Sequence, residues 1–218
     1  MDREMCASNP ERLTAFTRGG SSSTVQVALT AVFAALTTVA TVIVAVPFPT
    51  STGYLNFGDA LVMLSGFLLG PIGGSIAGGF GSAMGDVALG YTQFAPITFV
   101  VKGCEGGVVG LFCRMATGTS RLARGVRTSS DVRVTDVLGL LLAAVTMMLG
   151  YFLFEIPIYG FGVALAEMTT VNWIQVSVGA IVTLIVGPSL RHYLNAQIPS
   201  EAPEETLVVQ PTYEEPGS

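Results

Sequence analysis

Six apolar stretches dominate this sequence and constrain its fold more than any other feature. They cover residues 25–46, 57–69, 72–89, 94–115, 134–154 and 171–190. A helix needs about 20 residues to cross the ~30 Å hydrocarbon core of a bilayer, and about 17 to 25 are tolerated. Four stretches meet this length, the third is marginal and the second is short. We therefore predict an all-α membrane protein, and the short stretch needs a separate test.

Composition supports this class and sets the domain limits. Only 11% of the 218 residues are charged, whereas soluble domains carry roughly 25%. We predict one membrane domain at residues 25–192, between an N-terminal cytoplasmic tail at 1–24 and a disordered acidic tail at 193–218. Both tails have the polar composition of solvated segments.

The arginines test the short second stretch. Cytoplasmic loops are enriched in Lys and Arg close to the membrane, so arginine groups that share one side are separated by an even number of crossings. Counting residues 57–69 as a crossing gives four between the first two groups and two between the last two. This predicts six transmembrane helices with both termini in the cytoplasm. The three groups are Arg3, Arg12 and Arg18; Arg114, Arg121, Arg124, Arg127 and Arg133; and Arg191.

In this topology nearly all polar residues of the spans lie in the outer half of the membrane. Ionisable groups in a bilayer are costly and usually face a bundle interior or a wet cavity. A polar cluster restricted to one leaflet predicts a ligand cavity that opens to the outside. The loop at residues 47–56 is rich in turn-forming and polar residues, and we expect it to act as a lid. The candidate substrate-binding residues are Lys102, Glu105, Glu155, Asn172, Gln175, Asn56 and Tyr91.

Each candidate also has a structural alternative. Lys102 is the only lysine of the chain, and at i,i+3 it can pair with Glu105, either as a self-satisfied ion pair or as part of a ligand site. Asn172 and Gln175 share a helix face and can bond a ligand or a neighbouring helix. Tyr91 fits the aromatic belt at a membrane interface.

Three acidic residues lie at predicted helix ends. Asp59 is expected to cap the second helix. Glu155 precedes Ile156 and Pro157, where the helix is expected to stop. Asp86 lies near a helix C-terminus, where the macrodipole disfavours an anion, so it requires a compensating partner that the sequence does not identify.

Small residues recur at four-residue spacing in the first and third stretches. Ala31 and Ala35 form one such pair, and Ala77 and Gly81 form another. This spacing lets helix backbones approach closely. It predicts either internal packing of the bundle or a flat face that docks another membrane protein.

Enzyme classes find no support in the sequence. It lacks the G-x-S-x-G and H-E-x-x-H patterns, paired Cys/His metal spacings and a phosphate-binding G-x-x-x-x-G-K loop. We expect no catalytic activity, cofactor, metal or nucleic-acid partner. A stand-alone secondary carrier or channel for a small polar solute is the alternative, although it would need polar residues through both leaflets or an inverted repeat.

The central part of the chain resembles the substrate-binding S components of energy-coupling factor (ECF) transporters, specifically the riboflavin-type family. The resemblance covers roughly residues 28–190. The motifs that carry it are the N-x-G-D of Asn56 to Asp59, the L-L-G-P turn of Leu68 to Pro71, the G-G-x-G-S-A-x-x-D of Gly78 to Asp86, the A-P-x-T-x-x-x-K-G-x-E-G of Ala95 to Gly106, GYFLFE at Gly150 to Glu155 and NWIQ at Asn172 to Gln175.

This resemblance implies a cell-membrane protein that captures a vitamin or vitamin precursor from outside for ATP-driven uptake. It implies a membrane coupling (T) subunit and two cytoplasmic ATPase subunits as partners. In this scheme the coupling subunit docks on the small-residue motifs, which are Ala31, Ala35, Ala77 and Gly81. The resemblance does not choose the ligand, because riboflavin and the hydroxymethyl-pyrimidine precursor of thiamine both suit the polar residues.

Overall fold

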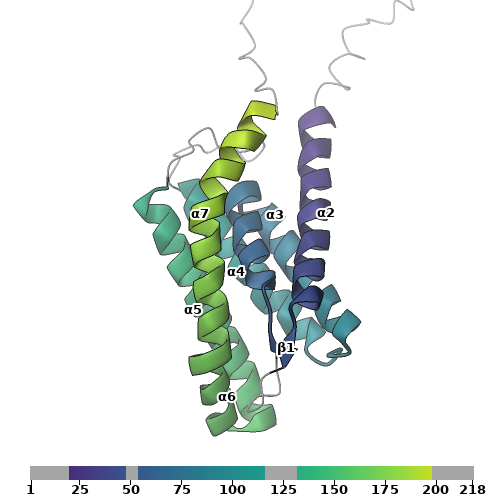
Figure 1. Ribbon diagram of the computed structural model, residues 1–218, viewed down its shortest axis with the longest axis vertical. Coiled ribbons are helices and arrows are strands. Elements are labelled where there is room, and N and C mark those ends of the chain that lie inside the picture. The colour runs from purple at the N-terminus through teal and green to yellow at the C-terminus, as the bar shows by residue number, and fades with distance from the viewer. Residues whose placement is uncertain (1–19, 48–53, 116–131, 198–218) are drawn as a thin grey trace, which may run out of the picture.

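The computed structural model describes residues 20–47, 54–115 and 132–197, which form a bundle of long helices with one two-stranded ribbon (Figure 1). Five helical segments are long and apolar enough to cross a membrane. This confirms the all-α membrane class. The elements are α2 (Gly20–Ile43), β1 (Val46–Pro47), β2 (Tyr54–Leu55), α3 (Gly58–Leu89), α4 (Ala95–Met115), α5 (Val134–Tyr159), α6 (Phe161–Glu167), the π-helical turn η1 (Met168–Asn172) and α7 (Trp173–Gln197).

Helix α3 is broken at Gly70 into two arms. Gly70 has φ 80° and ψ −170°, a conformation that only glycine adopts without strain. Pro71 follows it, and a proline disfavours helical geometry in the residue before it. The arms fold back on each other: a Cβ on Gly74 would lie 2.5 Å from the Cα of Gly66, and one on Gly78 would lie 2.8 Å from the side chain of Val62. The arms correspond to the predicted helices at 57–69 and 72–89.

Glycines let the arms of α3 and helix α4 touch backbone to backbone. A Cβ on Gly66 would lie 2.3 Å from the carbonyl oxygen of Gly106, and one on Gly106 would lie 2.4 Å from that of Gly74. Real Cβ atoms do not approach so closely, so these positions exclude any side chain. The close approach puts the arms and α4 at the centre of the bundle, beside the buried Phe67 and Val109.

The carbonyl end of the first α3 arm is closed by Arg191 of α7. The last carbonyls of a helix have no partner within it. The Arg191 guanidinium donates to the Phe67 carbonyl at 3.0 Å and lies 3.6 Å from the centre of the Phe67 ring. Arg191 lies near the C-terminal end of α7 and is fully buried, so it ties α7 to α3.

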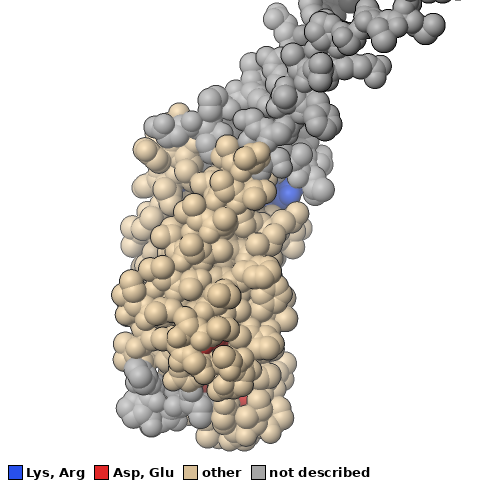
Figure 2. All heavy atoms as spheres, turned by 90° about the vertical axis from the view of Figure 1, so that its right-hand side faces the viewer, with Lys and Arg blue, Asp and Glu red and all other residues tan. Residues whose placement is uncertain are grey.

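The surface of the bundle is apolar and its interior holds the charges. Large apolar side chains such as Ile72, Leu141 and Ile185 are more than half exposed. Figure 2 shows one face with almost no charged atoms: one blue group lies near the upper end, and small red patches lie toward the lower end. This inside-out pattern suits a protein whose sides face lipid.

Two helix boundaries differ from the predictions. Helix α5 continues through Pro157 to Tyr159 and ends at Gly160, so Glu155 does not mark its end. A continuous helical path then runs from Phe161 through η1 into α7, ten residues before the predicted start at residue 171. Most of the predicted tails and the middle of the predicted lid lie outside the described residues.

The ends of the described chain share one end of the molecule. Helix α2 begins and α7 finishes at the top of Figure 1, whereas the β1–β2 ribbon and α6 lie at the bottom. In the ribbon, Val46 pairs with Leu55 and Pro47 with Tyr54. The ribbon brings residues 54–56 back over the bottom end of the bundle.

Candidate ligand-binding site

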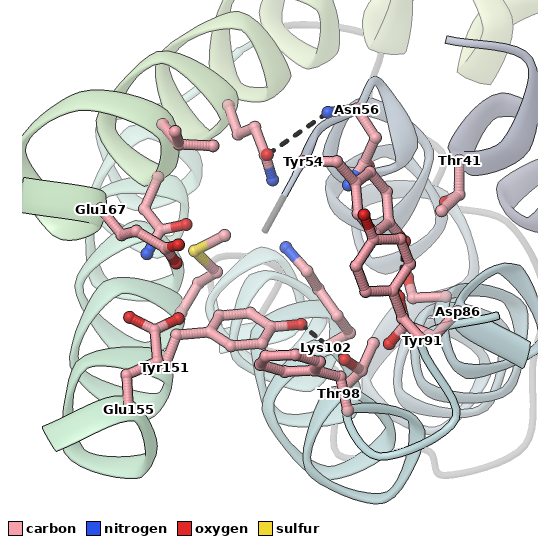
Figure 3. A pocket seen from close by; sticks show the side chains of 16 residues that line it. Thr41, Tyr54, Asn56, Asp86, Tyr91, Thr98, Lys102, Tyr151, Glu155 and Glu167 are labelled. Atoms are coloured by element: carbon pink, nitrogen blue, oxygen red, sulfur yellow. Dashed lines mark hydrogen bonds between the residues drawn. The ribbon is translucent and has the colours of Figure 1, made fainter. Parts of the chain in front are cut away.

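A cavity opens at the end of the molecule that carries the ribbon and α6 (Figure 3). It holds about 570 Å³ of unfilled space, part of it open solvent. Its wall combines carboxyl, amide, hydroxyl and aromatic groups from α2, β2, α3, α4, α5, α6, η1 and α7, and from the loop that joins α3 to α4. The lining residues are Thr41, Tyr54, Asn56, Ser82, Asp86, Tyr91, Phe94, Thr98, Lys102, Met147, Tyr151, Glu155, Glu167, Val171, Asn172 and Gln175.

The structure brings six of the seven candidate substrate-binding residues to this cavity. They come from segments that are far apart in sequence, as the outer polar cluster predicted. Glu105 does not line the wall; it is fully buried behind Lys102. The six are Asn56, Tyr91, Lys102, Glu155, Asn172 and Gln175.

Lys102 is held by two carboxylates rather than one. Its ammonium donates to Asp59 Oδ1 and, at 3.1 Å, to Glu105 Oε2. All three side chains are at most 4% exposed. The Lys102 Nζ also lies 5.6 Å from the centre of the Tyr151 ring. The lysine therefore forms part of the cavity wall and also the middle of a buried ion triad, so the two alternatives for this residue are compatible.

Asp59 does not cap α3, contrary to the expectation from sequence. Its side chain turns inward to Lys102, since a buried ammonium needs a counter-charge more than a helix end needs a cap. The start of α3 is instead served by Asn56, whose Oδ1 accepts the Gly58 N–H at 2.8 Å. The Asn56 N–H donates to Gln175 Oε1 at 3.3 Å, which links the ribbon to α7.

Tyr54 is the partner that Asp86 required. The Tyr54 hydroxyl donates to Asp86 Oδ1 at 2.5 Å. Burial, reinforced by the neighbouring Asp86 carboxylate, raises the pKa of Tyr54 far above its usual range, so the hydroxyl stays protonated and keeps donating. The Tyr54 ring packs on Tyr91 with 5.0 Å between ring centres. Asp86 thus fastens the ribbon over the cavity (Figure 3).

Aromatic side chains form another part of the wall. Tyr91 contacts Phe94 edge to face at 6.4 Å, and Phe94 stacks on Tyr159 at 6.1 Å. Deeper in, the Tyr151 hydroxyl donates to Thr98 Oγ1 at 2.9 Å. Rings of this kind suit the face of a flat ligand. Sequence reasoning missed Phe94, Thr98 and Tyr151, because apolar and hydroxyl residues inside spans give no signal that separates a cavity wall from ordinary packing.

The π-helical turn η1 aims three polar groups at the cavity from one helix face. One π turn advances about five residues rather than four, and such turns are frequent at functional sites. It aligns Glu167 with Asn172, and Gln175 follows on the same face. Glu167 was missed because it falls between the predicted spans at 134–154 and 171–190; its spacing to Val171 and Gln175, four and eight residues on, was the available signal.

Buried polar atoms without a partner gather around this cavity. Protein interiors seldom leave such atoms unpaired, because each costs about 1–3 kcal/mol. A ligand that supplied the missing partners would recover this cost. In the described part of the chain, the cavity-lining atoms without a partner are Thr41 Oγ1, Ser82 Oγ, Asp86 Oδ2, Glu155 Oε2 and Asn172 Nδ2.

The family follows from comparison with known proteins. The model of the family described as "ECF-type riboflavin transporter, S component" matches residues 21–192 of this chain. The chain belongs to this family. The confirmed membership makes it a transport protein of the cell membrane with several membrane-spanning helices.

Two relatives of this S component differ in what is known of them. A protein of Pyrococcus woesei described as an uncharacterized protein in the gap 3′ region is 38% identical over 161 residues, which are 74% of this chain and 95% of the relative. The thiamine precursor transporter HmpT of Lactococcus lactis subsp. cremoris (strain MG1363) is 27% identical over 164 residues, which are 75% of this chain and 86% of the relative.

The predicted docking residues of the S component divide into two groups. Ala31 and Ala35 lie on the exposed face of α2. Ala77 and Gly81 are buried; a Cβ on Gly81 would lie 2.6 Å from the Ala34 carbonyl oxygen, and Thr38 donates to the Gly81 carbonyl at 2.8 Å. The second pair therefore packs α3 on α2, and only the first pair is open to a partner.

Proposed function

We propose that this S component captures a vitamin or vitamin precursor from outside the cell and delivers it to an ATP-driven uptake complex. The observation that carries the proposal is the set of unpartnered buried polar atoms around a cavity at one end of the bundle. A ligand site explains why a membrane protein keeps them there, whereas a purely structural cluster would be expected to pair them internally.

The proposed orientation places the cavity outside and both termini in the cytoplasm. It rests on the arginine pattern of the sequence. It is supported by Figure 1, in which α2 begins and α7 finishes on the side of the bundle opposite the cavity. The fold-back of α3 at Gly70 supports six crossings, because each arm then counts separately. The first arm has 12 residues from Gly58 to Leu69 and would measure about 18 Å, so it would cross only with the help of the ribbon at its outer end.

The proposed substrate is one small heterocycle of the riboflavin or thiamine-precursor pyrimidine class. The family description includes a riboflavin transporter, and a relative is named as a thiamine precursor transporter. A flat ring between Tyr54, Tyr91 and Tyr151, with its polar edges on Asn172 and Gln175, fits the usual composition of small-molecule sites. ATP would be hydrolysed by partner subunits, with the coupling subunit docked on α2 at Ala31 and Ala35.

The test is ligand identification followed by calorimetry. Mass spectrometry identifies what co-purifies with the detergent-solubilised full chain, and the affinity for that compound is then compared in Gln175→Leu and Asn172→Leu. Each is expected to weaken binding about tenfold or more, because it leaves buried partners unpaired. Thr183→Val is the matched control, since Thr183 is fully buried, has an unpartnered hydroxyl and lies outside the cavity.

Unchanged affinity in both variants would mean that the cavity is not the binding site. Uptake of the ligand into vesicles that contain the purified chain alone would instead favour a stand-alone carrier.

A further inference from the structure

The cavity wall carries an excess of acid, and this bears on the proposed function because it narrows the class of substrate. Three carboxyl side chains line the cavity: Asp86, Glu155 and Glu167. The single cationic side chain among the lining residues is Lys102. A site for an anionic ligand would be expected to show the opposite balance.

Lys102 does not correct this excess. Its ammonium already bonds Asp59 and Glu105, so one positive charge meets two carboxyl groups within the triad. Withdrawing it toward an anionic ligand would leave both carboxyl groups buried without a counter-charge, which is strongly unfavourable. The lysine is therefore committed to its own protein.

The carboxyl groups on the other side of the cavity point toward each other. Glu155 of α5 and Glu167 of α6 both line the cavity and face one another across its wall (Figure 3). They are 3% and 4% exposed. Two carboxyl groups can bond only if a hydrogen lies between them, since an ionised carboxylate only accepts. A donor group of a ligand can supply that hydrogen in place of a proton.

Two buried atoms without a partner determine which ligand groups this part of the cavity wall would bind. Glu155 Oε2 is a buried acceptor without a partner, and Asn172 Nδ2 is a buried donor without one. Asn172 lies one π turn after Glu167, so the amide and the carboxyl pair border the same part of the wall. A complementary ligand edge would carry a hydrogen-bond donor or positive charge for the Glu155 oxygen, next to an acceptor for the Asn172 amide.

We infer that Glu155, Glu167 and Asn172 form a subsite for an amino-bearing or cationic heterocycle edge, and that the cavity rejects phosphorylated ligands. An aminopyrimidine offers this edge, with an amino donor beside a ring-nitrogen acceptor. The dione edge of a flavin places two carbonyl oxygens around one N–H, so its carbonyls would meet the carboxyl oxygens lone pair to lone pair. A phosphate ester would bring negative charge to a wall with no uncommitted cation among its lining residues.

The experiment is calorimetry on the full-length protein in detergent with four probes: 4-amino-5-hydroxymethyl-2-methylpyrimidine, its phosphate ester, thiamine and riboflavin. The free aminopyrimidine is expected to bind at least tenfold more tightly than its phosphate ester and than riboflavin. Glu155→Gln and Glu167→Gln are each expected to weaken aminopyrimidine binding at least tenfold. Thr183→Val is expected to leave it unchanged, and thermal unfolding midpoints establish that the variants are folded.

The outcomes separate this inference from the proposed function. Tighter binding of riboflavin or of the phosphate ester, or unchanged aminopyrimidine affinity in both glutamine variants, overturns the subsite. If riboflavin binds, and its affinity is weakened by Gln175→Leu but not by Glu155→Gln or Glu167→Gln, the proposed function stands and the subsite is overturned. If none of the four probes binds, the subsite and the proposed riboflavin or thiamine-precursor substrate class are both overturned.

Discussion

At the scale of single residues, the buried triad explains why the only lysine of the chain lies inside a membrane helix. An unmatched charge in a bilayer costs roughly 2.5–3.5 kcal/mol on insertion scales. Lys102 meets Asp59 from the first α3 arm and Glu105 from its own helix. The lysine thus ties α4 to α3 at the cavity wall, and its loss would affect folding before it affected binding.

The triad predicts unequal effects of two substitutions. Lys102→Met should destabilise the protein by about 3–5 kcal/mol, because it leaves buried carboxyl groups uncompensated. Glu105→Gln should cost about 1 kcal/mol, since Lys102 keeps Asp59 as its counter-ion. Thermal unfolding in detergent measures both. Equal midpoints for the two variants would show that the triad does not act as described.

The hydroxyl of Tyr54 gives a second prediction at this scale. Tyr54→Phe keeps the ring packed on Tyr91 but removes the bond to Asp86. Hydrogen bonds to charged groups contribute about 1.5–3 kcal/mol, so the bound ligand should dissociate roughly tenfold faster as the ribbon loosens. Stopped-flow displacement of the co-purified ligand measures the rate.

The matched control for this change is Tyr193→Phe, at an exposed position near the C-terminal end of α7, away from the cavity. An unchanged dissociation rate in Tyr54→Phe would mean that the Asp86 bond does not hold the ribbon over the cavity.

At the scale of elements, small residues serve two purposes that the sequence pattern alone does not separate. Ala77 is fully buried inside the bundle, and at Gly81 and Gly106 an added Cβ would collide with the backbone of a neighbouring segment. Ala31 and Ala35 leave a shallow strip on the outer face of α2. The first purpose concerns folding, and the second concerns association within the membrane.

An alanine-to-leucine substitution should therefore have different effects on the exposed face of α2 and in the buried contact of α3. Ala31→Leu should abolish ATP-dependent uptake by the assembled transporter while ligand affinity of the isolated subunit is unchanged, because only the outer face is altered. Ala77→Leu should lower the unfolding midpoint and ligand affinity together, since overpacking typically costs about 1–3 kcal/mol. Calorimetry and vesicle uptake are measured on the same preparations. Normal uptake by Ala31→Leu would exclude this strip as the docking face.

At the scale of the whole molecule, the cavity lies at one end of the bundle, and the start of α2 and the end of α7 lie at the other (Figure 1). The α3 fold-back at Gly70 makes this arrangement consistent with an even number of crossings. An outward cavity would load from outside, and the end with the termini would face the ATPase subunits.

The orientation is tested by labelling single cysteines in a chain without its native ones. A cysteine placed in the loop at residues 118–130 should react only after the membrane is opened, and one placed at Tyr91 should react from outside. Labelling of the 118–130 loop by a membrane-impermeant reagent in intact cells would refute the topology.

The sequence by itself determined the class, the length of most helices and the collection of polar residues at one end. Hydrophobic length is a local property, and so is the Gly70–Pro71 break, because glycine and proline restrict backbone geometry wherever they occur. The acidic and amide residues were identifiable as unusual because charged groups in a membrane span always need an explanation.

The tertiary structure alone decided which partner each of these residues meets. Asp59 pairs with Lys102 rather than capping its helix, Tyr54 reaches Asp86, and Glu167 faces Glu155. These pairs join segments between 12 and 43 residues apart in sequence, so no local pattern specifies them. They form because a buried polar group must find a partner in space, and only the packing of α3, α4, α5 and the π turn determines which one lies within reach.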